Sequence, residues 1–255
     1  MINHHPTSDV LAQFVAGNLP ASVSVLVASH VELCSECTRA VQALTEQAAT
    51  DAFGESRQEG LRDEPQAAGL TDVSALDDFD GFDDFDGLDD FDTFDQFGDS
   101  DEFADCINAI TALERDDTQQ LPQTVTEIAV GGERIPLPTA LKSIPLKEWQ
   151  GMGKLSRSRL ALDDGDLRMS LLHIDKGGSV PCHTHKGFEI TLLLQGSFTD
   201  EMGEYRKGDF IWLDGQHTHQ PVTEEGCVCL TVSSDAIRFT QGMSQLLNPI
   251  GRFIY

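Results

Sequence analysis

The chain has 255 residues, 40% of them hydrophobic and 24% charged, which is enough to bury the cores of two domains. Its 17 basic and 43 acidic residues give a net charge of −26, which argues against direct binding to nucleic acid or an anionic membrane and favours a basic protein partner. No stretch approaches the ~20 apolar residues that cross a bilayer, and no signal-peptide pattern opens the chain. We therefore expect a cytoplasmic protein.

Helical spacing organises the first fifty residues. Apolar positions recur at helical intervals in a first helix that Ser8 or Asp9 can cap and that Gly17 can end. Pro20 can open a second helix that runs toward a cysteine motif, and a third is predicted over about 34–49. This part of the chain predicts a small helical domain.

The cysteine motif has the spacing of a zinc site, with His30, Cys34 and Cys37 separated by four and three residues. On a helix or helix-turn these three side chains can converge on one ion. Tetrahedral zinc needs a fourth ligand, for which His5 is the nearest candidate in sequence and His4 its competitor. Two thiolates with two imidazoles favour zinc, whereas the alternative is a histidine beside two free thiols.

A strongly acidic segment follows. No lysine, arginine or histidine occurs between Arg62 and Arg115, and an Asp-Asp-Phe-Asp motif recurs three times from Asp77 to Asp92. Repulsion at this density outweighs what a few phenylalanines can bury, so residues 51–102 are predicted to be a disordered linker. A segment that engages a basic surface through its phenylalanines is the alternative interpretation.

Helical spacing returns over residues 103–116, where Phe103, Ile107 and Ile110 predict an amphipathic helix. From about residue 135 the pattern changes to short apolar or alternating runs separated by Gly and Asp turns. Regularly spaced strands of this kind indicate a β-sandwich or small barrel, including the jelly-roll type, so the fold class is α+β with several domains. The clearest predicted strands are 168–174, 189–194, 209–213 and 227–232.

A second set of metal-ligand residues lies in the β-rich part. His183, His185 and Glu189 have equal parity along an extended chain and can therefore share one face. His219, ahead of His217, is the candidate for a fourth ligand. Three imidazoles and a carboxylate suit zinc, iron, manganese or nickel, so this site predicts zinc or another divalent metal.

Two glycine-framed segments match the signatures of the cupin family. The first runs from Gly177 to Gly196, and the second runs from Gly208 to His219, with Asp214 where proline is usual. The cupin resemblance implies that these segments belong to a jelly-roll barrel.

Together, the two motifs resemble the ChrR-type zinc-containing anti-sigma factors, in which a helical HxxxCxxC domain precedes a cupin domain. The resemblance covers residues 1–50 as the zinc-binding anti-sigma domain and 135–255 as the cupin domain, and we expect the helix at 103–116 to complete the former. The matching elements are His5, Phe14 to Gly17, His30/Cys34/Cys37, Pro181 to Glu189, His219 to Pro221 and the pair Cys227/Cys229.

The resemblance implies that the chain sequesters a sigma factor of the extracytoplasmic-function (ECF) type through a zinc-dependent helical domain. It further implies release under oxidative stress, by singlet oxygen or organic hydroperoxide, with the metal-binding cupin domain needed for the response. The predicted ligands are His5, His30, Cys34 and Cys37 for zinc, and His183, His185, Glu189 and His219 for the cupin metal.

The competing hypothesis is a cupin metalloenzyme, dioxygenase-like or decarboxylase-like, with a zinc-stabilised interaction domain. Because no substrate-binding residues or general acid accompany the ligands, we predict no catalytic residues and no enzyme. Apolar residues of the second helix, Val23, Leu26, Val27 and Val31, are either partner contacts or core. Cys227 and Cys229 are predicted to be buried strand residues rather than a redox pair.

Overall fold

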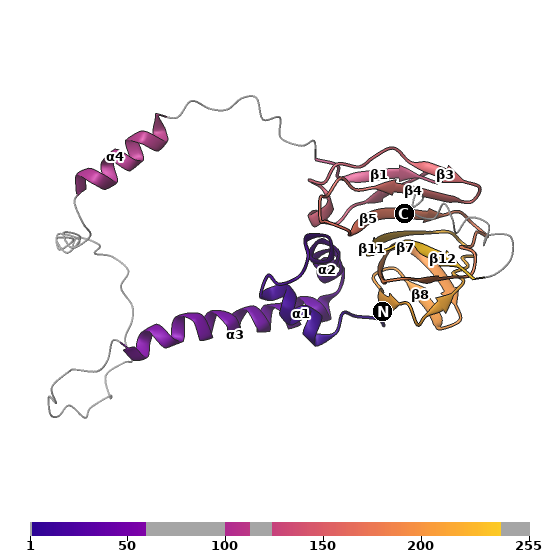
Figure 1. The fold of residues 1–255 in the computed structure, drawn as a ribbon, viewed down its shortest axis with the longest axis horizontal. Helices are drawn as coiled ribbons and strands as arrows, with labels where there is room; N and C mark the ends of the chain where they lie inside the picture. The colour runs from indigo at the N-terminus through magenta and orange to yellow at the C-terminus, as the bar shows by residue number, and fades with distance from the viewer. Residues whose placement is uncertain (1, 60–99, 113–123, 241–255) are drawn as a thin grey trace, which may run out of the picture. The chain divides into compact units, whose positions relative to one another are not determined.

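The computed structural model describes residues 2–59, 100–112 and 124–240 (Figure 1). The chain divides into two units, one formed by Met1–Gly60 with Pro122–Tyr255 and the other by Leu61–Leu121. Among the described residues, no helix has the length and apolar character required to cross a membrane. The predicted acidic repeat lies outside the described residues.

Three helices form the N-terminal part: α1 (Ser8–Val15), α2 (Ala21–Leu33) and α3 (Ser35–Glu59) (Figure 1). The hydroxyl of Thr7, not of Ser8, caps α1 by accepting the backbone N–H of Val10. Gly17 follows α1 with φ of +70°, a conformation that glycine adopts at little cost. Pro20 directly precedes α2, as predicted.

Helix α3 is longer than its apolar spacing predicted and continues past Thr50 to Glu59. Residues 51–59, predicted to begin the disordered linker, are therefore helical. Phe53 in this extension is 77% exposed, so no buried stripe marks these residues as helical. The extension follows a run of alanine, glutamine and glutamate residues, whose intrinsic propensity favours a helix without any packing partner.

The predicted helix after the acidic repeat is present as α4 (Ser100–Thr111), which belongs to the second unit. Ile107 and Ile110 are 46% and 63% exposed. Completion of the anti-sigma domain by this helix remains a prediction.

The β-rich part contains the predicted strands in an all-antiparallel arrangement, with two sheets and a hairpin. Its larger sheet has seven strands in the order β3-β4-β5-β11-β7-β8, with β9 also paired to β7, and its smaller sheet has the order β10-β6-β12. The hairpin is β1 (Glu127–Val130) with β2 (Glu133–Pro136), followed by the short helix η1 (Thr139–Leu141). The sheets consist of β3 (Gln150–Met152), β4 (Leu155–Arg159), β5 (Arg168–Ile174), β6 (His183–His185), β7 (Phe188–Asp200), β8 (Gly203–Arg206), β9 (Phe210–Asp214), β10 (Thr218–His219), β11 (Cys227–Ser233) and β12 (Ile237–Phe239).

The buried face of α2 shares a hydrophobic core with the larger sheet. Val23, Leu26 and Val27 are at most 1% exposed, and they belong to the same cluster as Leu192 of β7 and Leu230 of β11. The sequence left open whether these residues contact a partner or belong to the core. The structure shows that these three are core residues. Burial of a side chain of this size contributes about 1.5–3 kcal/mol to folding, so the helical part and the barrel stabilise one another.

Candidate metal centres

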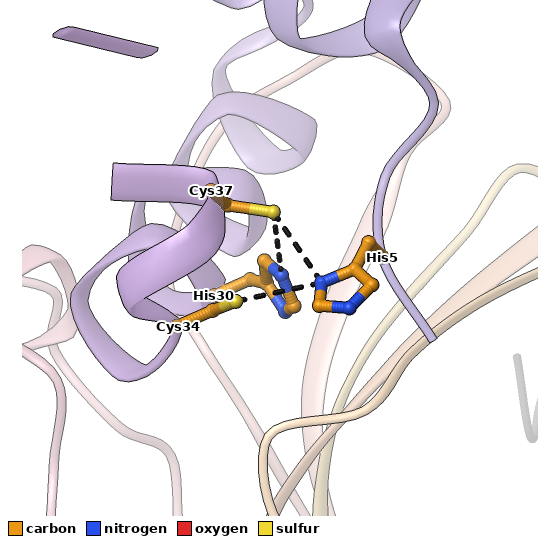
Figure 2. A group of neighbouring side chains, drawn as sticks. All are labelled: His5, His30, Cys34 and Cys37. Carbon is orange, nitrogen blue, oxygen red and sulfur yellow. Dashed lines mark hydrogen bonds between the residues drawn. The ribbon is translucent and has the colours of Figure 1, made fainter. Parts of the chain in front are cut away.

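Four side chains converge at the N-terminal predicted zinc site (Figure 2). His30 comes from the last turn of α2, Cys34 from the junction between α2 and α3, and Cys37 from the first turn of α3. His5 reaches the same point from the extended segment before α1, as Figure 2 shows. One donor atom from each of the four lies within 4.8 Å of the others.

The distances between these donors fit a tetrahedral zinc ion. His30 Nε2 lies 3.3 Å from Cys37 Sγ, and His5 Nδ1 lies 3.4 Å from Cys34 Sγ and 3.5 Å from Cys37 Sγ. With Zn–S and Zn–N bonds of about 2.3 and 2.0 Å, a tetrahedral angle puts sulfur and nitrogen about 3.5 Å apart. His4 instead places its ring 4.8 Å from that of Tyr205, so His5 is the histidine of this cluster.

Hydrogen bonding and burial prepare His30 to act as a ligand. Its Nδ1 donates to the carbonyl oxygen of Gly208 at 2.8 Å, which leaves Nε2 unprotonated and directed at Cys37. Burial lowers the pKa of His30 to about 4, so its imidazole is neutral near pH 7. Burial, with Cys34 nearby, raises the pKa of Cys37 to about 12, so a cation is needed to hold this thiolate.

The segment that carries His5 is held by β9 and the turn before it. The carboxylate of Asp209 accepts the backbone N–H groups of Asn3 at 2.8 Å and His4 at 3.1 Å. The backbone N–H of Phe210 donates to the carbonyl oxygen of His4 at 3.0 Å. Sequence reasoning missed Asp209 as a supporting residue, and its only signal was membership of the second cupin segment.

The second cluster comprises His183, His185, Glu189 and His219, all of them predicted. His183 of β6 and His219 of β10 are direct cross-strand partners, and Glu189 enters from β7. His219 Nε2 lies 3.1 Å from His183 Nε2 and 3.3 Å from His185 Nε2, while Glu189 Oε2 lies 3.4 Å from His185 Nε2. Ligands at about 2.1 Å from one ion lie roughly 3.0–3.4 Å apart, so this cluster also fits a metal.

The imidazole tautomers strengthen that fit. His183 Nδ1 donates to the carbonyl oxygen of Pro181 at 2.8 Å, and His219 Nδ1 donates to Asp200 Oδ2 at 3.0 Å. Both Nε2 atoms are then unprotonated, and their lone pairs would repel at 3.1 Å without a cation between them. Sequence reasoning missed Asp200, which has no spacing relation to the ligand motif.

Burial also removes charge from this cluster. It lowers the pKa of His183 to about 4 and of His185 to about 3, and it raises the pKa of Glu189 to about 7. A divalent cation bound here would be coordinated by neutral imidazoles and would stabilise the ionised form of Glu189, which burial otherwise disfavours. His217 stays outside, because its Nδ1 pairs with Asp214 and its side chain is 42% exposed.

The remaining described cysteines do not join either cluster. Cys182, Cys227 and Cys229 are buried, as predicted for the last two. Cys227 and Cys229 belong to a second hydrophobic cluster with Ile174 and Phe198. Their position is that of core side chains.

Comparison with known proteins identifies relatives of both halves. Residues 146–236 match the family model described as the ChrR cupin-like domain. The anti-sigma-E factor ChrR of Cereibacter sphaeroides is 27% identical over 256 residues, covering 98% of this chain and 99% of that protein. The crystal structure of Rhodobacter sphaeroides SigE in complex with the anti-sigma ChrR matches with a TM-score of 0.53 and 26% identity, covering 91% of this chain and 100% of that one.

Proposed function

We propose that this chain, a ChrR-type protein, is an anti-sigma factor that binds a sigma factor and keeps it from RNA polymerase. The observation that carries the proposal is the His5/His30/Cys34/Cys37 cluster, which joins the segment before α1 to α2 and α3. The chain that carries it is similar along its length to a ChrR anti-sigma factor. The structural relative is an anti-sigma ChrR in complex with SigE, which supports a sigma factor as the partner. The chain is accordingly a regulator and not an enzyme.

The sigma factor belongs to the ECF type under this proposal. A chain with net charge −26 suits a partner whose polymerase-facing and DNA-facing surfaces are basic, because opposite charges accelerate association and orient the two proteins. Since Val23, Leu26 and Val27 are buried against the barrel, apolar contacts to the sigma factor come from other surfaces.

Zinc at the N-terminal cluster organises the domain that binds the sigma factor. The four donors tie the segment before α1 to the junction of α2 and α3. Structural zinc sites contribute roughly 10–16 kcal/mol to the folding of small domains, so removal of the ion would release these elements from one another. The thiolates of Cys34 and Cys37 are the ligands most susceptible to oxidants.

Release of the sigma factor under oxidative stress, by singlet oxygen or organic hydroperoxide, requires the cupin domain under this proposal. His30 bonds to Gly208 O, and Gly208 N in turn donates to Leu193 O at 2.8 Å on the strand that carries Glu189. Glu189 is therefore connected to the N-terminal cluster through a short part of β7 and two hydrogen bonds, and a change in its coordination can act along this connection. This connection supports a role of the cupin metal in the response.

The test is affinity purification of the tagged full-length chain from its native bacterium, with identification of bound proteins by mass spectrometry. The wild type should recover one sigma factor, and Cys34→Ala/Cys37→Ala should recover none. Cys227→Ala, which removes a buried cysteine outside both clusters, should retain the partner. Absence of a sigma factor from the wild-type sample would refute the proposal.

The zinc-dependent part has its own measurement. Wild type purified without added chelator should contain one zinc ion more than the double cysteine variant. A double variant that keeps its zinc but loses the sigma factor would separate partner binding from the metal and contradict the organising role of zinc.

A further inference from the structure

The hairpin that joins β7 to β8 places an exposed methionine beside the support of a metal ligand. Its turn consists of Glu201 and Met202, because Asp200 at the end of β7 pairs with Gly203 at the start of β8. The Met202 residue is 42% exposed. By contrast, the side chain of Asp200 is 1% exposed, and its carboxylate accepts the Nδ1–H of His219 at 3.0 Å. A surface thioether and a buried carboxylate that orients a ligand imidazole are therefore two residues apart in the sequence.

The carboxylate of Asp200 links this turn to the ligand. Its Oδ1 accepts the backbone N–H of Met202 at 2.8 Å and that of Gly203 at 3.2 Å, while its Oδ2 accepts from His219. The position of the carboxylate therefore depends on a turn that directs both N–H groups at it. A partner of this kind fixes the tautomer and orientation of a ligand imidazole, and its loss costs roughly 10–100-fold in metal affinity.

A second hydrogen bond ties the turn to the strand that carries this ligand. Glu201 Oε2 accepts the backbone N–H of Gln220 at 2.9 Å, and Gln220 directly follows His219. Strand β8 stands at the end of the strand order of the larger sheet, where it pairs with β7. A short strand at the edge of a sheet opens more easily than a central strand. A change in the turn can therefore act on His219 while the core stays folded.

Exposure distinguishes Met202 from the sulfur atoms that are buried in the described part of the chain. Met169 of β5 is 3% exposed, and the buried cysteines are Cys34, Cys37, Cys182, Cys227 and Cys229. An oxidant in solution reaches the thioether of Met202 without any opening of the fold. A thioether also reacts without losing a proton, whereas a cysteine reacts as the thiolate. Access therefore favours Met202 over these residues as the first site of oxidation.

We propose that Met202 is a site of oxidation by organic hydroperoxides and that its sulfoxide loosens the metal of the cupin cluster. The sulfur lone pair attacks the terminal oxygen of the hydroperoxide, the O–O bond breaks, and an S–O bond forms. The hydroperoxide proton passes to the leaving alkoxide, which departs as an alcohol, so the sulfur is oxidised and the hydroperoxide is reduced. This step supplies a chemical input to the proposed release under oxidative stress, and its role in the cell rests on that proposal.

The sulfoxide acts on the turn through hydrogen bonding. Oxidation replaces an apolar thioether by a polar, chiral group whose oxygen is a strong hydrogen-bond acceptor. This acceptor stands on the residue whose own N–H, together with that of Gly203, is held by Asp200. Side-chain acceptors compete for backbone N–H groups close to them in sequence. Each N–H group that leaves Asp200 weakens the support of His219 and with it the hold on the metal.

The test treats the full-length, zinc-loaded chain with a limiting amount of cumene hydroperoxide. Peptide mass spectrometry should find the sulfoxide at Met202 before it appears at Met169, the buried methionine that serves as internal control. One zinc ion per chain should then pass to a chromogenic chelator about tenfold faster than before treatment, as expected when a ligand imidazole loses its supporting partner. A Met202 that stays unmodified, or that is oxidised no faster than Met169, would overturn the assignment of the site.

Met202→Leu is the matched variant, because leucine keeps the volume of the side chain and lacks the sulfur. Its zinc transfer should be as slow after hydroperoxide treatment as before. Cys34 and Cys37 are unchanged in this variant, so zinc released by oxidation of their thiolates appears equally in both proteins. Equal acceleration in Met202→Leu and wild type would overturn the link between the sulfoxide and the metal. Neither measurement includes a sigma factor, so a failure here is distinguishable from a failure of partner binding.

Discussion

The imidazole of His30 donates a hydrogen bond of 2.8 Å from Nδ1 to the carbonyl oxygen of Gly208, so a residue of the N-terminal donor cluster is oriented by the barrel. Gly208 has φ of +93°, and a Cβ atom at this position would collide with the side chain of Ile2. Glycine at position 208 therefore lets the backbone present this carbonyl group without displacing Ile2. This relationship makes the geometry of the N-terminal centre depend on the fold of the C-terminal part.

Gly208→Ala should weaken zinc binding at the N-terminal cluster, because the added methyl group displaces Ile2 and with it the segment that carries His5. Backbone strain alone should lower the free energy of unfolding by about 1–2 kcal/mol. Gly153→Ala is the matched control, since Gly153 also has positive φ but has nothing within 4 Å of its would-be Cβ. Thermal melts and competition with a chromogenic zinc chelator would measure both. Equal zinc affinity in the two variants would contradict the role assigned to Gly208.

Asp209→Ala should release the segment before α1. The buried carboxylate accepts backbone N–H groups of Asn3, His4 and Arg206, and hydrogen bonds to a charged group contribute about 1.5–3 kcal/mol each. We expect a loss of at least about 2 kcal/mol in urea unfolding and a zinc affinity reduced about tenfold. Asp175→Ala is the control, because its carboxylate is exposed and accepts the adjacent backbone N–H of Lys176. A stable Asp209→Ala with unchanged zinc affinity would show that His5 does not need this anchor.

Asp200→Asn should reduce metal affinity at the cupin cluster by about 10–100-fold, because a carboxylate that accepts from a ligand imidazole fixes its tautomer and raises its basicity. Zinc at the N-terminal cluster should be unaffected. Metal analysis after dialysis against limiting chelator would distinguish the two centres. Asp214→Asn, beside the exposed His217, is the control and should keep both ions. Loss of both ions from Asp200→Asn would indicate general unfolding.

The contact between Asp164 and the start of α2 should depend on pH. Burial favours the neutral acid, but hydrogen bonds from the backbone and hydroxyl of Ser22 outweigh it and lower the pKa of Asp164. A lowered pKa in the folded state stabilises the fold above the unfolded value of about 3.9, and this contribution is lost as pH falls through the lower folded value. The stability difference between wild type and Asp164→Asn should therefore be largest above pH 5 and shrink below pH 4.

Urea unfolding of both proteins from pH 6 to pH 3 would measure that difference and would cancel the titration of groups that the two proteins share. Asp163→Asn removes an exposed neighbouring carboxylate and should follow the wild type across the range. A difference that stays constant with pH would exclude Asp164 as the titrating group.

Local spacing determined much of what the sequence predicted correctly. The three N-terminal helices, the four clearest strands and six donor residues follow from intervals of two, three or four residues, because such intervals fix which side chains share a face. The six are His30, Cys34, Cys37, His183, His185 and Glu189. The sequence did not predict the last part of α3, because residues 51–53 are exposed and carry no buried apolar side chain at helical spacing.

The tertiary structure decided what depends on contacts between distant residues. The choice of His5 over His4, the support from Asp200 and Asp209, and the burial of α2 against the barrel all join residues that no spacing rule relates. The sequence shows which residue types can donate to a metal and at what intervals they occur. The residues that hold these donors in place are brought to them by strand pairing and helix packing, which only the folded chain defines.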